Sequence, residues 1–155
     1  MTPTRHYNCW FRRRRSSVTA SRHLVHVSRQ SIRWGDMDAF GHVNNTVYFR
    51  YMEQARLEWL EAQDPQYMAT DGEESSVIAN ASCDFLLSLV YPGDLEVRMF
   101  VGKPGRTSIA TYYEMWSDGR KFAEGASRIV WIKRSTGRST PLPGAIKALL
   151  DASNG

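Results

Sequence analysis

The sequence has few cysteines and no long apolar run. Its 155 residues include two cysteines, Cys9 and Cys83. Two thiols cannot build a disulfide framework, and no Cys/His cluster has the spacing of a zinc or iron–sulfur site, so a reducing compartment, the cytoplasm, is the expected location. No apolar stretch approaches the roughly 18 residues of a membrane span. We therefore expect no transmembrane segment.

Acidic residues are absent from the first 30 positions, which carry seven arginines. The whole chain has 20 basic and 16 acidic side chains and a net charge of +4. The residues after position 30 therefore hold 13 basic side chains against all 16 acidic ones, a net charge of −3. The basic pI of about 9.3 thus describes one end of the chain and not its body, and nucleic acid is not an expected partner.

Residues 1–22 are rich in Arg, Ser and Thr and show neither helical nor strand periodicity. They are predicted to form a disordered basic arm, followed by one domain over residues 23–155, which is the size of an ordinary domain. Three origins of the arm stay open: a start codon set too far upstream, a basic segment that contacts anionic lipid or RNA, and an organellar transit peptide. A secretory signal is excluded because no apolar core follows the arginines.

The body of the chain begins with a strand pattern and continues with a helix pattern. Near-alternation of apolar and polar residues predicts a strand from His23 to Gly35. From 46 to 62, apolar residues recur three or four positions apart with charged residues between them, which predicts the one long helix of the chain. Asn44 or Asn45 would cap its N-terminus.

Beyond residue 75 the hydrophobic period changes to two. Four segments rich in Val, Ile, Tyr, Phe and Trp are strand candidates, separated by turn signals such as Asp118-Gly119. A short helix is expected over residues 143–151. The four predicted strands cover residues 76–91, 94–103, 107–117 and 122–134.

This order of elements predicts an α+β fold in which a curved antiparallel sheet wraps around one long central helix. The strands carry more apolar side chains than one helix can cover. We therefore expect a second copy on the uncovered face, as a homodimer or a homotetramer. The side chains behind this expectation are Leu95, Val97, Met99 and Val101 in one strand, and Ile109, Tyr112 and Trp131 in others.

The loop from Gly35 to Asn45 gathers two carboxylates, a histidine and two amides between the first strand and the helix. Taken alone, the pattern also suits a structural loop, with Asp36 and Asp38 as turn formers and the asparagines as caps. A metal site formed by Asp36, Asp38 and His42 would lack a fourth ligand, so no metal is expected. Cys83 has no base near it in the sequence and is interpreted as a small core residue.

The segment that contains this loop resembles a known family. IRWGDMDAFGHVNNTVYFRYMEQARLEWLE, residues 32–61, is similar to the opening of the hotdog-fold acyl-CoA thioesterases of the 4-hydroxybenzoyl-CoA thioesterase-like group, whose pattern is D-x-D-x-x-G-H-V-N-N-x-x-Y-x-x-Y-x-E-x-A-R. Residues 81–98 and 137–150 resemble later segments of the same family. The pattern is met by Asp36, Asp38, Gly41, His42, Val43, Asn44, Asn45, Tyr48, Tyr51, Glu53, Ala55 and Arg56.

The resemblance implies a catalytic carboxylate at Asp38 and an oxyanion donor in the backbone N–H of Asn45. A helix N-terminus presents unpaired N–H groups and partial positive charge, which suit a developing oxyanion. Asp38 would attack the thioester or activate a water, and the sequence leaves both open. Gly41 would let the backbone approach the substrate closely.

The remaining candidates have two interpretations each. His42 is a candidate catalytic residue that orients substrate or water, or it is structural. Asn44 and Tyr48 are candidate substrate-binding residues, although an aromatic residue such as Tyr48 at helical spacing is also typical of a core. Asp36 is expected to stabilise the loop as a hydrogen-bond acceptor.

The function predicted from the sequence is hydrolysis of an acyl- or aroyl-CoA thioester to the free acid and CoA, without a cofactor. The alternative is a hotdog module that senses acyl-CoA without cleaving it. The CoA phosphates would contact basic residues that the sequence does not rank. These candidates are Arg98, Lys103, Arg106, Arg134 and Arg138.

Overall fold

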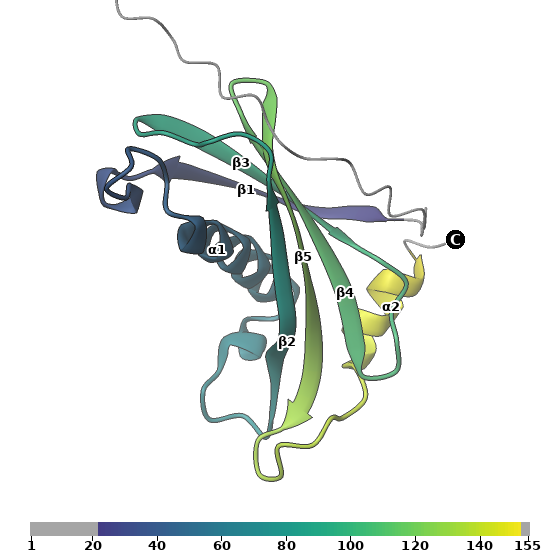
Figure 1. The fold of residues 1–155 in the computed structure, drawn as a ribbon. Coiled ribbons are helices and arrows are strands. Elements are labelled where there is room, and N and C mark those ends of the chain that lie inside the picture. The colour runs from purple at the N-terminus through teal and green to yellow at the C-terminus, as the bar shows by residue number, and fades with distance from the viewer. Residues whose placement is uncertain (1–21, 153–155) are drawn as a thin grey trace, which may run out of the picture.

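The computed structural model describes residues 22–152, which form a curved antiparallel sheet of five strands with the long helix α1 packed across its concave face (Figure 1). The predicted α+β fold is confirmed. The predicted arm, except Arg22, lies outside the described residues. The elements are β1 (His23–Ile32), η1 (Trp34–Asp36), α1 (Asn45–Gln63), η2 (Pro65–Met68), β2 (Glu74–Phe85), β3 (Gly93–Val101), β4 (Ser108–Ser117), β5 (Arg120–Lys133) and α2 (Gly144–Ala152).

Local signals at both ends of α1 explain its bounds. Asn44 is the N-cap, and its side-chain oxygen accepts the Thr46 N–H at 2.9 Å. At the other end the Asp64 N–H reaches the Leu60 carbonyl at 3.1 Å, and Pro65 follows, which has no N–H to continue the helix. Six apolar side chains of α1 are buried, and none of the helices in residues 22–152 is long and apolar enough to cross a membrane.

The strand order in the sheet is β1-β3-β4-β5-β2, and every neighbouring pair is antiparallel. The predicted strand over residues 76–91 ends earlier, at Phe85. Its remaining apolar residues leave the sheet: the Leu86 and Leu87 N–H groups both donate to the Phe122 carbonyl. The connection therefore carries the chain from one sheet edge to β3, and the expected turn between consecutive neighbouring strands is absent here.

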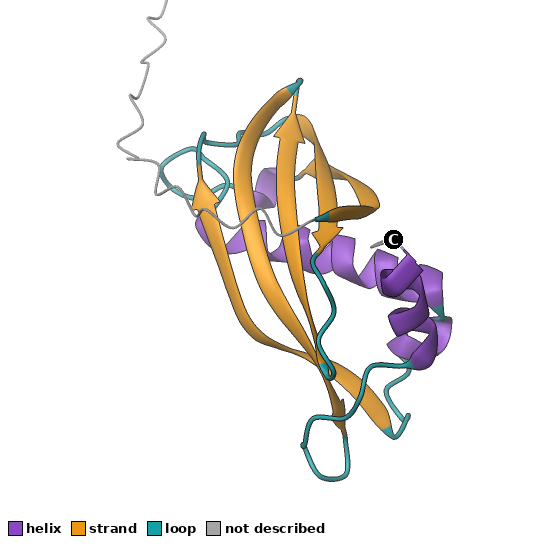
Figure 2. Cartoon of the chain, turned by 90° about the vertical axis from the view of Figure 1, so that its right-hand side faces the viewer, coloured by secondary structure: helices purple, strands orange, loops and turns teal. Residues whose placement is uncertain are grey.

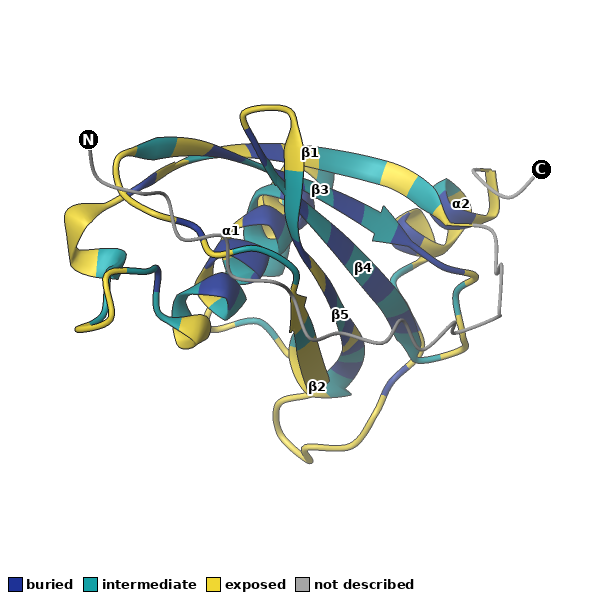
Figure 3. Ribbon diagram, turned by 45° about the horizontal axis from the view of Figure 1, so that its top comes forward, coloured by how far each residue is buried: buried dark blue, intermediate teal, exposed yellow. Residues whose placement is uncertain are grey.

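The core lies between the sheet and the helices, and the side chains of β3, β4 and β5 alternate between it and the outer face (Figure 3). Leu95, Val97, Met99 and Val101 are at most 2% exposed, and Ile109 and Trp131 are equally buried. Ile146 and Leu150 of α2 belong to the same buried cluster. These six strand side chains are buried without a second copy, whereas Tyr112 is half-buried, so the burial of the six does not itself require a partner and the oligomeric state stays a prediction.

The strand β2 forms one of the two edges of the described sheet, the other being β1, and we call it the β2 edge (Glu74–Phe85). Nine of its twelve residues are exposed. Val77, Ile78 and Phe85 are 41%, 38% and 36% exposed, and β2 pairs with β5 on one side only. An exposed apolar edge of this length is a surface that other chains can pair with. Figure 2 shows the sheet with α1 passing behind its strands.

Candidate active site

The loop between β1 and α1, residues 36–44, folds back on itself as a short ladder. The Asn44 N–H donates to the Asp36 carbonyl at 2.9 Å, and the Asp38 N–H donates to the His42 carbonyl at 2.8 Å. Gly41 closes the turn with its N–H on the Asp38 carbonyl at 3.1 Å. Its φ of 78° lies in the left-handed region that favours glycine. The ladder fixes Asp38 relative to the start of α1.

Asp38 is half-buried and has one carboxylate oxygen in use. Oδ1 accepts the Phe40 N–H at 2.8 Å. Oδ2 accepts no hydrogen bond from any residue of the described chain. One oxygen therefore holds the side chain in the loop, while the other is available to react with a substrate or a water.

Asn45, the first residue of α1, presents an unpaired backbone N–H. Its neighbours on both sides use theirs: the Asn44 N–H binds the Asp36 carbonyl, and the Thr46 N–H binds the Asn44 side chain. Within residues 22–152, the Asn45 N–H has no protein acceptor. The first turn of α1 contains no acidic residue, so the partial positive charge of the helix start is not neutralised there.

Asp36 has a different environment from Asp38. Its Oδ2 accepts both the Arg33 N–H and the Tyr51 hydroxyl, each at 2.8 Å. Burial, followed by the bond to Asp36 and its charge, raises the pKa of Tyr51 well above the usual value. The expectation that Asp36 stabilises the loop as an acceptor agrees with this arrangement. Tyr51 is in the motif, but nothing in the sequence distinguishes it from other core aromatics.

Two further sequence candidates lie inward. Tyr48 is 3% exposed, its hydroxyl accepts the Leu89 N–H at 3.2 Å, and its ring packs edge-on against Phe85. Burial raises its pKa, against the lowering effect of the Leu89 bond. The Asn44 side chain is occupied by Thr46, whose N–H and hydroxyl both donate to it. Substrate-binding roles for Tyr48 and Asn44 stay predictions, since both have structural partners.

His42 and Cys83 complete the titratable groups that the sequence singled out. His42 is half-buried, and its side chain has no hydrogen bond with the described residues. Cys83 is partly buried against the core, as predicted, and burial together with nearby Asp84 raises the pKa of its thiol to about 12. A thiol with that pKa stays protonated at neutral pH and is a poor nucleophile. In residues 22–152 no three His, Cys, Asp or Glu side chains are grouped to hold a metal ion.

Two exposed aromatic side chains, Trp34 just before the loop and Phe40 within it, were not singled out from the sequence as site residues. Trp34 is 78% exposed and Phe40 is 86% exposed. They lie on either side of Asp36 and Asp38 along the chain. Exposed rings beside the Asp38 loop provide apolar surface for a ligand or for a second subunit.

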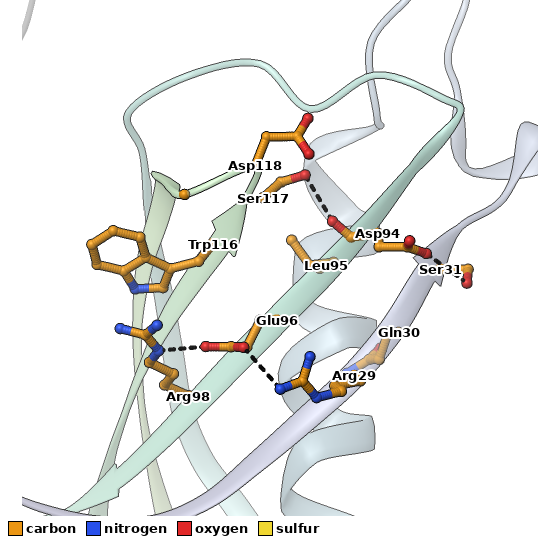
Figure 4. Close-up of a pocket in the computed structure, with 11 residues that line it drawn as sticks. Arg29, Gln30, Ser31, Asp94, Leu95, Glu96, Arg98, Trp116, Ser117 and Asp118 are labelled. Carbon is orange, nitrogen blue, oxygen red and sulfur yellow. Dashed lines mark hydrogen bonds and ion pairs between the residues drawn. The ribbon is translucent and has the colours of Figure 1, made fainter.

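Two cavities lie near β1, and neither is lined by Asp38. A polar cleft of about 660 Å³ separates β1 from α1 and is lined by Asp36. A second pocket of about 420 Å³ lies beside the turn between β4 and β5 (Figure 4). There Arg98, a candidate for the CoA phosphates, donates to Glu96 at 2.6 Å and lies 4.7 Å from the Trp116 ring centroid.

The other four basic candidates lie at the opposite end of the sheet from the loop. Phe85, at the end of β2, packs on Tyr48 near the start of α1. Arg134 donates its N–H to Glu73, just before β2 begins. The full length of β2 separates these ends, roughly 36 Å at 3.3 Å per residue. Lys103 and Arg106 lie between β3 and β4, and this connection reaches the same end as Arg134 and Arg138, because the Thr107 carbonyl accepts the Trp131 N–H while the Arg138 carbonyl accepts the Lys133 N–H.

The chain is similar to known proteins over most of its length. The model of the thioesterase-like superfamily matches residues 32–150. Protein YsmA of Bacillus subtilis is 24% identical over 113 residues, which are 72% of this chain and 76% of that protein.

Two solved structures are similar in fold and in sequence. The PA2801 protein of Pseudomonas aeruginosa is 32% identical with a TM-score of 0.77, and the match covers 82% of this chain and 98% of that one. A thioesterase from Thermus thermophilus, solved with coenzyme A and Zn, is 30% identical with a TM-score of 0.74, and covers 85% and 96% respectively. With its hotdog fold, the chain belongs to the thioesterase-like superfamily and is a thioester hydrolase.

Proposed function

We propose that the chain hydrolyses acyl-CoA or aroyl-CoA thioesters, with Asp38 and the Asn45 N–H as the reacting groups. The observation that carries this proposal is their juxtaposition in sequence and structure. A carboxylate with one unpaired oxygen lies in a loop that leads directly into a helix whose first N–H is also unpaired. CoA as the thiol is supported by the Thermus thermophilus thioesterase, which was solved with coenzyme A.

The chemistry assigned to the two groups is complementary. The thioester carbonyl oxygen would accept the Asn45 N–H, which stabilises negative charge as the carbon becomes tetrahedral. In one route Asp38 attacks that carbon, CoA leaves as the thiolate, and water hydrolyses the resulting mixed anhydride. In the other route Asp38 takes a proton from a water that attacks the carbon, and the tetrahedral species formed with that water expels CoA as the thiolate and leaves the free acid. Both routes need the unpaired Oδ2 of Asp38.

A hydrolysis screen tests this proposal. The purified chain would be incubated with acyl-CoA esters of increasing length and with aroyl-CoA esters, and released CoA would be followed by a thiol reagent. We expect turnover of at least one class. Tight binding of an acyl-CoA without any thiol release would instead favour the non-catalytic sensor.

We also propose that two copies pair through the β2 edge as a homodimer. Two such dimers can associate into a homotetramer. The reason differs from the one expected from sequence: the uncovered surface is a strand edge with exposed Val77 and Ile78. Two-fold pairing of antiparallel strands sets the beginning of one β2 beside the end of the other. Arg134 of the partner subunit would then lie near Phe85 and the loop, within reach of the CoA phosphates.

Oligomeric state is the test of this second proposal. Light scattering at micromolar concentration should report a dimer or a tetramer for the natural chain. Ile78→Lys places a charge on the β2 edge and should shift the chain toward the monomer, whereas Arg120→Ala, at the distant β4–β5 turn, should not. A natural chain with a monomer mass of 17.7 kDa would refute the pairing.

A further inference from the structure

The geometry points to Tyr51 as a positioning residue for thioester hydrolysis: its hydroxyl, acting through Asp36, holds the loop with Asp38 against the helix that presents the Asn45 N–H. This inference rests on the proposed function. Tyr51 would touch neither the substrate nor the reacting atoms.

The first step of the argument is that Asp36 joins three parts of the chain. Its Oδ2 accepts the Tyr51 hydroxyl from the second turn of α1 and the Arg33 N–H from the end of β1. Its backbone carbonyl accepts the N–H of Asn44, the residue that caps α1. One aspartate therefore connects the strand, the loop and the helix.

The second step is that the loop ladder connects Asp36 to both reacting groups. The Asp36–Asn44 hydrogen bond is the base of the loop ladder, and the next rungs are the Met37–Val43 bridge and the Asp38–His42 bond. Asn45 follows Asn44 directly. Asp36 lies on the side of this hydrogen bond that leads to Asp38, and Asn44 lies on the side that leads to Asn45. A shift of Asp36 relative to α1 would therefore move the Asp38 carboxylate relative to the Asn45 N–H.

The third step is that Tyr51 is a rigid, permanent donor. Its side chain is 5% exposed, and its carbonyl accepts the Gln30 side-chain amide at 3.0 Å, which ties this turn of the helix to β1. Burial and the neighbouring Asp36 raise the pKa of Tyr51, so the hydroxyl keeps its proton throughout the working pH range. Hydrogen bonds to a charged acceptor are also stronger than those between neutral groups.

These observations set the expected effect of removing the hydroxyl. Tyr51→Phe keeps the ring in the core and removes one donor from Asp36. Misplacing reacting groups by about 1 Å costs up to about 100-fold in rate. We expect a smaller displacement, with kcat lower by about tenfold and KM changed by less than about twofold, because substrate binding does not involve the hydroxyl.

A matched control is available in Tyr113. Its hydroxyl is also buried and hydrogen-bonded, to Thr111 at 3.0 Å, but it lies in β4, in the core and away from the loop. Tyr113→Phe should lower the melting temperature without lowering kcat. Tyr51→Phe should lower kcat by about tenfold while the pH dependence of kcat keeps its shape, since Tyr51 does not titrate in the reaction.

Coupling to Asp36 distinguishes positioning through that residue from any other role. In an Asp36→Ala background the acceptor is absent, so Tyr51→Phe should cause no further loss of kcat. Amide hydrogen exchange gives a readout that does not depend on activity: the Asn44 and Asp38 amides should exchange faster in Tyr51→Phe than in the natural chain or in Tyr113→Phe.

Several results would overturn the inference. They are a Tyr51→Phe variant with kcat within twofold of the natural chain, an equal loss in Tyr113→Phe, or additive losses in the double variant. If the natural chain hydrolyses no thioester, the proposed function fails, and the exchange experiment still decides the role of Tyr51: unchanged exchange at Asn44 and Asp38 in Tyr51→Phe refutes it.

Discussion

Asp38→Asn is the most direct test of the proposed chemistry. The amide has nearly the size of the carboxylate, and its oxygen can still accept the Phe40 N–H that Oδ1 accepts in the natural chain. The amide NH₂ would replace Oδ2, which has no partner within the described chain, so no buried donor loses its acceptor. The charge needed for a nucleophile or a base is lost, while the loop is retained.

The expected magnitude follows from these two facts. Loss of a positioned general base or nucleophile lowers kcat by about 100-fold or more, which corresponds to about 2.7 kcal/mol in activation free energy. The free energy of unfolding should change by no more than about 0.5 kcal/mol, because no buried contact is removed. Activity and stability are therefore expected to separate.

The assay is the release of CoA thiol from the best ester of the screen, together with thermal unfolding. Asp36→Asn is the matched control, because it makes the same chemical change two residues away. Its remaining oxygen can still accept the Tyr51 and Arg33 donors, so it should lose less turnover than Asp38→Asn.

Two outcomes would refute the reasoning. If Asp38→Asn stays within about threefold of the natural rate while Asp36→Asn is inactive, the roles of the two carboxylates are reversed from those proposed. If both variants keep the full rate, hydrolysis does not depend on this loop, and the loop would serve only to bind acyl-CoA.

Two further predictions concern stability. Asn44→Ala removes the N-cap of α1 and should lower the free energy of unfolding by about 1 kcal/mol in a urea titration, and an unchanged midpoint would show that the cap is dispensable. Burial alone raises the pKa of Glu58, but hydrogen bonds from His26, Gln54 and Ser28 outweigh it and lower the pKa below 4.5. Because the folded state favours ionised Glu58, its stabilisation is present above pH 4.5 and is lost as pH falls through the lowered pKa. Glu58→Gln should therefore be less stable than the natural chain near neutral pH, and this difference should shrink in acid. A difference that is independent of pH would contradict the assignment.

Elements that depend on nearby residues could be predicted from the sequence. The period of apolar side chains and a capping asparagine predicted α1 to within one residue at each end, as Asn45–Gln63. Alternation predicted most strand bounds, and the density of polar groups in residues 36–45 identified the loop. These signals are local, because a helix cap and a strand face are each decided within a few positions.

Contacts between residues far apart in the sequence could not be predicted and follow from the tertiary structure. Residues 86–91 have the apolar composition of a strand, but the N–H groups of Leu86 and Leu87 donate to the Phe122 carbonyl and that of Leu89 donates to the Tyr48 hydroxyl, so this segment does not pair with β3. The strands were expected to carry more apolar side chains than one helix can cover, and nothing in the sequence shows that Ile146 and Leu150 join the same buried cluster.

The candidate site divides in the same way. Asp38 and Asn45 could be named from the motif, yet their unpaired atoms depend on which neighbours the fold supplies. The Tyr51–Asp36 hydrogen bond joins residues 15 positions apart, and it forms only because the loop folds back onto the second turn of α1. A sequence specifies which groups are available, and the path of the backbone through the fold decides which of them meet.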